Sequence, residues 1–328
     1  MKQLVPVYLW FLLSYTDAVN TSNDDYIVSV TASSDLTYPN EILQFSPSNV
    51  SEIFGSASYP NFENTLFSTY DETNGRWFLL QENCLIDVYD PENITLLHSI
   101  DYCSAITIQL PAAIHYETET DLLWLFWTDV ADVQTQWCSL PASSIDNAEF
   151  SAADCYRLNA PEQGTLQYTP DASAFDSMNR VAWAQVQILA SSDIILIGFS
   201  TISKEYEPIV PMHSLCQHWQ VVYLNQSTHV PTLMCTLFQK NALAVIDPAS
   251  GDTLQTIYKF PELHFPVMHT SIARQRSEET ASYYIQLKGA THYLWQEVDC
   301  ATGGVLSNSS YLIAGNLPLA MPAYISTS

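Results

Sequence analysis

Short blocks of apolar, aromatic and β-branched residues alternate with polar turns from residue 26 onward. Typical blocks are Trp77-Phe-Leu-Leu80 and Leu122-Leu-Trp-Leu-Phe-Trp127. Such blocks, bounded by Asp, Asn, Gly, Pro and Ser, are typical of β-strands. No stretch keeps apolar side chains at i, i+3, i+4 and i+7 between helix caps. The pattern therefore predicts an all-β protein.

The blocks recur as a four-strand unit of about fifty residues, a period typical of repeat architectures. The clearest unit has expected strands at 65–71, 77–80, 84–89 and 94–100, with turns at 72–75 and 90–93. The strands expected in the next four units are 113–117, 122–127, 136–140 and within 149–158; 173–176, 181–186 and 194–199; 220–224, 232–235, 243–247 and 254–258; 270–273, 283–286, 292–299 and from 305 onward.

A sixth unit is split between the two ends of the chain. Residues 26–30, 41–45 and 51–54 supply its second to fourth strands, and residues 323–326 supply the first. A wheel closed in this way leaves no open sheet edge. We therefore predict one domain over 19–328, a six-bladed β-propeller closed by both termini. Seven blades is the alternative count, and a two-sheet β-sandwich is the alternative fold.

Three hairpins between the third and fourth strands share a turn. They are Val245-Ile-Asp-Pro-Ala-Ser-Gly-Asp-Thr-Leu254, Val88-Tyr-Asp-Pro-Glu-Asn-Ile94 and Val298-Asp-Cys-Ala-Thr-Gly-Gly-Val305. They resemble the Asp-x-x-x-Gly turn of quinoprotein-like and YVTN-type β-propellers. The resemblance covers three of the six units and implies an architecture, because the Asp and Gly serve a tight backbone bend. It implies no activity.

The first 18 residues have the features of a secretory signal. Lys2 is basic, Val5 to Leu13 are apolar, and Thr16 and Ala18 are small residues at positions −3 and −1 of a cut after Ala18. The apolar run is too short to span a bilayer, as is every later one. We therefore expect a secreted, extracellular protein. A buried N-terminal strand is the alternative.

Glycosylation sequons and cysteines agree with that compartment. Three cysteine pairs with similar separations predict disulfides and leave Cys300 over, and no Cys-x₂-Cys zinc pattern occurs. The connectivity is a hypothesis. The expected pairs are Cys84–Cys103, Cys138–Cys155 and Cys216–Cys235, and the sequons are Asn20, Asn49, Asn93, Asn225 and Asn308.

Composition excludes several partners. Of 328 residues, 47% are hydrophobic and 14% charged, which suits a large packed core. Ten Lys and Arg against 35 Asp and Glu give a net charge of −25, so nucleic acids and anionic membranes are disfavoured and cationic partners favoured.

The propeller prediction sorts the turns onto two faces. With strands a to d numbered outward from the axis, the d–a and b–c connections share one face, and the a–b and c–d turns share the other. Six histidines and several acids fall in or beside the first set, where they could bind Ca²⁺ or Zn²⁺ or act as general bases. Solvated or hydrogen-bonded loop side chains are the alternative. The candidate residues are His115, His213, His218, His264, His269, His292, Glu63 and Asp129, with Glu82, Asp132 and Asp171 nearby.

The opposite face has acids in the a–b turns. They could bind Ca²⁺, but a solvated acidic rim is the favoured interpretation, since no Asp-x-Asp-x-Asp-Gly loop occurs. These acids are Asp71, Glu72, Glu117, Glu119, Asp121, Asp176, Glu278 and Glu279.

Other chemistry-bearing residues are few. Arg274 and Arg276 alternate on an expected inner strand and form a candidate anion clamp. No Gly-x-Ser-x-Gly motif or phosphate-binding Gly-rich loop occurs. The sequence thus favours a secreted, glycosylated propeller that binds an extracellular protein, glycan or small molecule, or acts structurally. The alternative is a metal-dependent hydrolase or lactonase that uses the His/Asp face.

Overall fold

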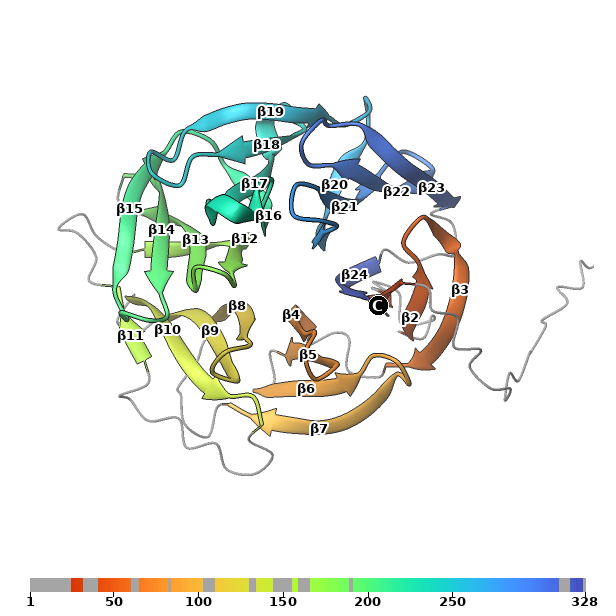
Figure 1. Ribbon diagram of the computed structural model, residues 1–328, viewed down its shortest axis with the longest axis horizontal. Helices are drawn as coiled ribbons and strands as arrows, with labels where there is room; N and C mark the ends of the chain where they lie inside the picture. Colours follow the sequence, from red (N-terminus) through yellow and green to blue (C-terminus); the bar gives the residue numbers. More distant parts are fainter. Residues whose placement is uncertain are drawn as a thin grey trace, which may run out of the picture.

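Six four-stranded antiparallel sheets are arranged as the blades of a wheel in the computed structural model (Figure 1). The structure describes residues 25–31, 41–59, 65–81, 84–102, 110–129, 134–143, 155–158, 166–188, 191–312 and 319–326. The six-bladed all-β prediction is therefore confirmed. The predicted signal (1–18) and Asn20 lie outside the described residues.

The first three blades follow the chain in order. Their strands are β4 (Thr65–Asp71), β5 (Arg76–Gln81), β6 (Leu85–Asp90) and β7 (Thr95–Asp101) in blade 1; β8 (Leu110–Glu117), β9 (Leu122–Asp129), β10 (Gln134–Pro141) and β11 (Cys155–Arg157) in blade 2; and β12 (Leu166–Asp176), β13 (Val181–Ile188), β14 (Ile194–Ser200) and β15 (Tyr206–Met212) in blade 3.

The remaining blades complete the ring. Their strands are β16 (Cys216–Val222), β17 (Thr232–Leu237), β18 (Ala242–Ile246) and β19 (Thr253–Lys259) in blade 4; β20 (Phe265–Gln275), β21 (Ala281–Lys288), β22 (His292–Asp299) and β23 (Val305–Leu312) in blade 5; and β24 (Leu319–Ile325), β1 (Tyr26–Thr31), β2 (Glu41–Ser46) and β3 (Asn49–Ser58) in blade 6.

Blade 6 joins the two ends of the chain. β24 pairs antiparallel with β1, from Tyr26 opposite Ile325 to Thr31 opposite Leu319. The C-terminal strand is therefore the innermost strand of the sheet that the N-terminal strands complete, as the sequence predicts.

The core consists of six apolar clusters, one in each gap between neighbouring blades. Successive side chains of a strand point to opposite faces of its sheet. On β5, Trp77 and Leu79 therefore pack against blade 6, while Phe78 and Leu80 pack against blade 2. Because both faces are covered, the central strands are almost continuously apolar. The tryptophans of the second strands, Trp77, Trp124, Trp127 and Trp183, are all buried.

The outer strands curve around the rim and meet the next blade (Figure 1). In the c–d hairpin of blade 4, Asp247 accepts a bond from the amide of Ala249 at 3.0 Å, and Gly251 adopts φ +75°. A Cβ at Gly251 would collide with the Pro211 carbonyl on β15 of blade 3. Gly303 has the same relation to Ile257 of β19. The Asp-x-x-x-Gly turn thus fits one blade against the preceding one.

Two predicted disulfides are present, Cys138–Cys155 between β10 and β11 and Cys216–Cys235 between β16 and β17. Cys84 is also disulfide-bonded, but Cys103 lies outside the described residues. Cys300 is buried as a free thiol. No helix among the described residues is long and apolar enough to cross a membrane.

Candidate functional site: the axial cavity

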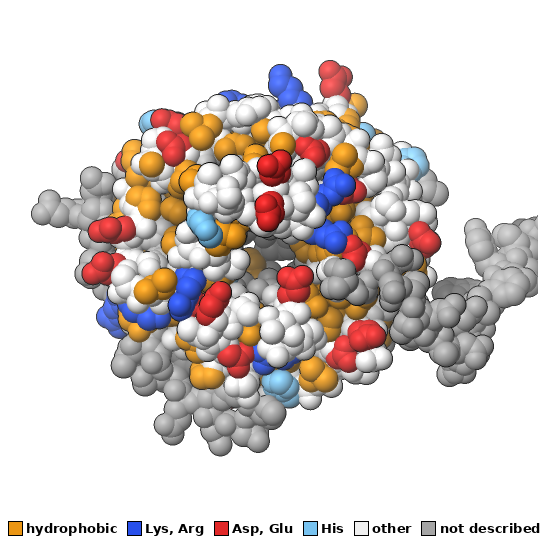
Figure 2. Space-filling model, viewed as in Figure 1, with side chains coloured by type: hydrophobic (Ala, Val, Ile, Leu, Met, Phe, Trp, Pro, Cys, Tyr) orange, Lys and Arg blue, Asp and Glu red, His pale blue; other side chains and the backbone are white. Residues whose placement is uncertain are grey.

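A cavity of about 650 Å³ lies where the inner strands of all six blades meet. Figure 2 shows the hollow at the centre of the wheel, with Asp, Glu, Lys and Arg side chains around it. Residues of β4, β8, β12, β16, β20 and β24, and the first residues of the turns that follow some of them, form its wall.

Several small side chains line this cavity. Inner-strand side chains point alternately into the two adjacent gaps: Ile272 packs toward blade 6 and Ala273 toward blade 4. Serines occupy lining positions in several blades, among them Ser68, Ser173 and Ser271. The wall therefore combines hydroxyl groups with strand edges.

His115 lies inside β8 and forms part of the cavity wall. The sequence pattern predicts a position in or beside a loop between strands. Its ring stacks on Phe175, with centroids 5.9 Å apart, and its Nε2 lies 3.2 Å from the Ser173 Oγ. Burial lowers the pKa of His115 to about 3. The imidazole is therefore uncharged at neutral pH.

His218 also lies within an inner strand, β16, and is 3% exposed. Its Nδ1 is 2.8 Å from the Thr236 Oγ1, and its Nε2 is 2.7 Å from the Val267 carbonyl oxygen on β20. Both ring nitrogens have protein partners, so this ring joins blades 4 and 5.

The other candidate histidines are spread around the molecule. His213 is exposed and lies 4.0 Å from Asp252. The Nδ1 of half-buried His264 is 3.0 Å from the Glu262 carbonyl, and that of exposed His292 is 2.7 Å from the Thr291 Oγ1.

Six residues of the predicted site lie wholly or with their side chains outside the described part of the chain. Glu63, Glu82 and Asp132 lie outside the described residues, as do the side chains of Asp129, Asp171 and His269. Among the side chains that are described, no three His, Cys, Asp or Glu form a group that could hold a metal ion. The Ca²⁺ or Zn²⁺ site therefore remains a prediction.

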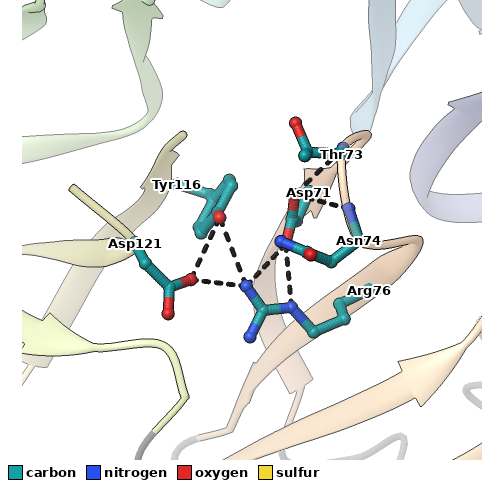
Figure 3. Close-up of polar contacts among 6 residues, drawn as sticks. All are labelled: Asp71, Thr73, Asn74, Arg76, Tyr116 and Asp121. Carbon is teal, nitrogen blue, oxygen red and sulfur yellow. Dashed lines mark hydrogen bonds and ion pairs between the residues drawn. The ribbon is translucent and has the colours of Figure 1, made fainter. Parts of the chain in front are cut away.

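A network of hydrogen bonds and ion pairs joins blades 1 and 2 at the a–b turns (Figure 3). Asp71 is fully buried, and it accepts bonds from the amides of Thr73 and Asn74, both at 3.1 Å. Arg76 pairs with Asp71 at 2.6 Å and, across the gap, with Asp121 at 2.5 Å. Burial alone would raise the pKa of Asp121, but hydrogen bonds from Arg76 and Tyr116 outweigh it and hold the pKa below its ordinary value.

Glu117 makes the corresponding connection between blades 2 and 3. Its buried carboxylate accepts bonds from Arg180 Nε and Thr201 Oγ1 of blade 3, both at 2.5 Å. Within blade 2, Trp124 Nε1 donates to it at 3.0 Å and Thr120 Oγ1 at 2.6 Å. Burial would raise the pKa of Glu117, but these four donors together hold it below its ordinary value.

The next two gaps use tyrosine and glutamine. Fully buried Asp176 of blade 3 accepts a bond from the Tyr223 hydroxyl of blade 4. The Tyr223 amide donates to Gln275 Oε1 of blade 5 at 3.0 Å, and Gln275 Nε2 donates to the Tyr223 carbonyl at 2.6 Å.

Blades 5 and 6 are joined by Arg274. Its guanidinium pairs with Asp25 at 2.5 Å and lies 4.2 Å from the centroid of the Tyr324 ring. The Tyr324 hydroxyl donates to Asp25 at 2.8 Å. Residues from both ends of the chain thus hold one arginine.

These contacts form a polar belt across five of the six gaps, defined by Asp71, Arg76, Asp121, Glu117, Arg180, Asp176, Tyr223, Gln275, Arg274 and Asp25. The sixth gap is joined farther out, where Gln44 Nε2 donates to the Glu92 carbonyl at 2.8 Å. The expectation of a solvated acidic rim is therefore wrong for Asp71, Glu117 and Asp176, because interblade donors surround them.

Exposed charge remains at the edge of the cavity. Glu72, Glu119, Glu278 and Glu279 are exposed. Glu72 and Arg276 are exposed lining residues, and Arg276 has a contact of 3.5 Å with Ser282 Oγ. Arg274 is committed to Asp25, so the expected two-arginine clamp is reduced to Arg276.

Comparisons with known proteins identify the architecture. No protein-family model matches the chain, and no curated protein matches it. Among solved structures, a protein of unknown function from Bacteroides caccae has a TM-score of 0.55 at 8% sequence identity, over 92% of this chain and 99% of that one. At this identity the likeness concerns the fold alone.

Proposed function

We propose that this protein is a secreted, glycosylated binding propeller that receives a polar ligand in its axial cavity and does not transform it. The observation that carries the proposal is the cavity of about 650 Å³ whose wall is supplied by all six blades. Its volume is in the range of pockets that hold small molecules or the end of a larger ligand.

The lining favours a ligand with hydroxyl or amide groups and an apolar side. Phe175 and Tyr324 contribute aromatic rings to the wall, and Ser173, Gln220 and Ser271 contribute polar groups. A terminal glycan residue or a small polar metabolite has this mixture of groups. Glu72 and Arg276 add one exposed charge of each sign, so the ligand need not carry a large net charge.

The titratable groups around the cavity favour binding over catalysis. A general base needs a pKa near the working pH and a free lone pair. The pKa of His115 lies far below neutrality, and His218 uses both of its nitrogens within the fold. Asp71, Glu117 and Asp176 are saturated with donors in the polar belt.

Surface features support the extracellular part of the proposal. The four sequon asparagines in the described residues, Asn49, Asn93, Asn225 and Asn308, are all exposed. Two disulfides close loops within blades, and disulfides persist in oxidising compartments.

A cavity-filling variant tests the proposal. The full chain is expressed in a eukaryotic secretory host, and protein from the medium is screened by thermal shift against panels of glycans and polar metabolites. We expect at least one compound to raise the Tm of the parent, and Ser271→Phe to abolish that shift because its ring occupies the cavity.

The matched control is Ser56→Phe on β3, an exposed position away from the axis. It should retain the shift. Retention of the same shift by folded Ser271→Phe, failure of every compound to shift the parent, or absence of the protein from the medium would each contradict the proposal.

A further inference from the structure

Two exposed side chains with soft-metal chemistry face each other at the a–b turns of blades 3 and 4. The Nδ1 of His229 lies 2.9 Å from the Sδ of Met178. Met178 is 39% exposed, and His229 is also exposed. The two residues are 51 positions apart in the chain, so the fold brings them together.

The backbone around the pair is fixed by bonds between the two turns. Asn179, which follows Met178, donates from Nδ2 to the His229 carbonyl at 2.9 Å and from its amide to Asp176 at 2.9 Å. The Tyr223 hydroxyl donates to the same Asp176 from blade 4. The amide of His229 donates to the Gln226 carbonyl at 3.0 Å. The geometry of the pair is therefore set by the polar belt.

We propose that Met178 and His229 bind a soft monovalent metal ion, Cu(I), for which Ag(I) is a redox-inert substitute. A thioether is a soft ligand that selects Cu(I), and imidazole also suits copper. Without metal, the short contact between His229 Nδ1 and Met178 Sδ is a hydrogen bond in which Nδ1 carries the proton and donates to sulfur. With metal, the neutral ring carries its proton on Nε2, and both lone pairs point to the ion.

Little movement is needed to admit the ion. With bond lengths like those of zinc sites, about 2.0 Å to nitrogen and about 2.3 Å to sulfur, a tetrahedral angle places the two ligand atoms roughly 3.5 Å apart. Rotation within the flexible Met178 side chain can widen the present separation of 2.9 Å between Nδ1 and Sδ to that distance. Solvent can fill the remaining coordination positions because both side chains are exposed. The net charge of −25 favours the approach of any cation.

Competition for Cu(I) with a chromogenic chelator tests the site under anaerobic, ascorbate-reduced conditions. All proteins carry Cys300→Ala, which removes the free thiol as a rival soft ligand. We expect one ion per chain, with the affinity at least tenfold weaker in Met178→Leu and in His229→Gln. With ¹³C-methyl methionine, Ag(I) should shift the Met178 resonance and leave those of buried Met212 and Met234 in place.

His213→Gln is the matched control, since His213 is exposed and has an acidic neighbour but no methionine partner. It should bind Cu(I) like the parent, and all variants should keep the parent Tm because the changed side chains are exposed. Parent-like affinity in either Met178→Leu or His229→Gln, or an Ag(I) shift confined to another methionine, would overturn the proposal. The proposed ligand of the axial cavity plays no part in this test, so the outcome of the test is independent of the proposed function.

Discussion

Glu117 illustrates how much the location of a residue depends on distant partners. Its place beside an a–b turn suggests a surface acid, yet its side chain is fully buried among donors from two blades. No local pattern encodes this, because Arg180 and Thr201 are 63 and 84 positions away. The same holds for Met178 and His229, whose pairing depends on two turns from different blades.

Removing the charge of Glu117 should destabilise the wheel. Glu117→Gln leaves Arg180 and Thr201 without their charged acceptor, and we expect a loss of about 2–3 kcal/mol in the free energy of unfolding, measured with urea at pH 7. Glu119→Gln, an exposed change two residues away, should cost less than about 0.5 kcal/mol.

The pH dependence follows from the direction of the pKa shift. Folding lowers the pKa of Glu117 below its ordinary 4.5. Its contribution is complete above that value and is lost as pH falls through the folded-state pKa. The difference between the parent and Glu117→Gln should therefore shrink between pH 6 and pH 3.5. A difference that stays constant over this range would show that the charge is not responsible.

At the scale of the strand, the sequence predicted the positions of strands well where neighbouring blades cover both faces of a sheet. Strands such as β21, buried at all but its last position, give continuous apolar blocks that any pattern search detects. The outer strand β15 went unpredicted, because Pro208 and Pro211 interrupt it and its residues alternate between partly buried and exposed. Proline is tolerated there since an edge strand leaves some amide positions unpaired.

We expect the short strand β11 to depend on its disulfide more strongly than β16 and β17 of blade 4 depend on theirs. It has only three residues, and Cys155 ties it to Cys138 of β10. Replacing both cysteines with alanine should cost about 3 kcal/mol for a loop of this size. It should also release β11, so that the Leu158 amide, which donates to the Thr135 carbonyl, loses protection in hydrogen exchange.

The double change Cys216→Ala and Cys235→Ala provides the comparison. β16 and β17 are longer strands, and their pairing runs from Cys216 opposite Leu237 to Val222 opposite Thr232. Stability should fall in that variant without selective loss of protection in either strand. Equal local release in both variants would contradict this account of β11.

At the scale of the whole molecule, the number of blades and the split sixth blade could be predicted. The repeat has one incomplete unit at each end of the chain, and together the two complete one four-stranded blade that closes the ring. The positions of the candidate histidines could not be predicted. Two of them, His115 and His218, turned out to be packed within inner strands, where twist and burial depend on the neighbouring blade.

Deleting residues 319–328 should abolish the cooperative thermal transition of the parent, since it removes β24, uncovers the edge of β1 and takes Tyr324 from Arg274. A circular permutant that joins residues 326 and 25 by a short Gly/Ser linker and opens between Ala249 and Ser250 keeps every strand pair. It should unfold near the parent Tm. A truncated chain as stable as the parent would show that β24 is dispensable.

The pairing of β24 with β1 also constrains how the chain is made. During synthesis, β1, β2 and β3 emerge well before β24, the strand that completes their sheet. Until β24 is synthesised, the edge strand β1 lacks its partner, and an unpaired edge can pair with any extended segment nearby. The edge of β1 is therefore open to mispairing from the synthesis of β1 until the synthesis of β24.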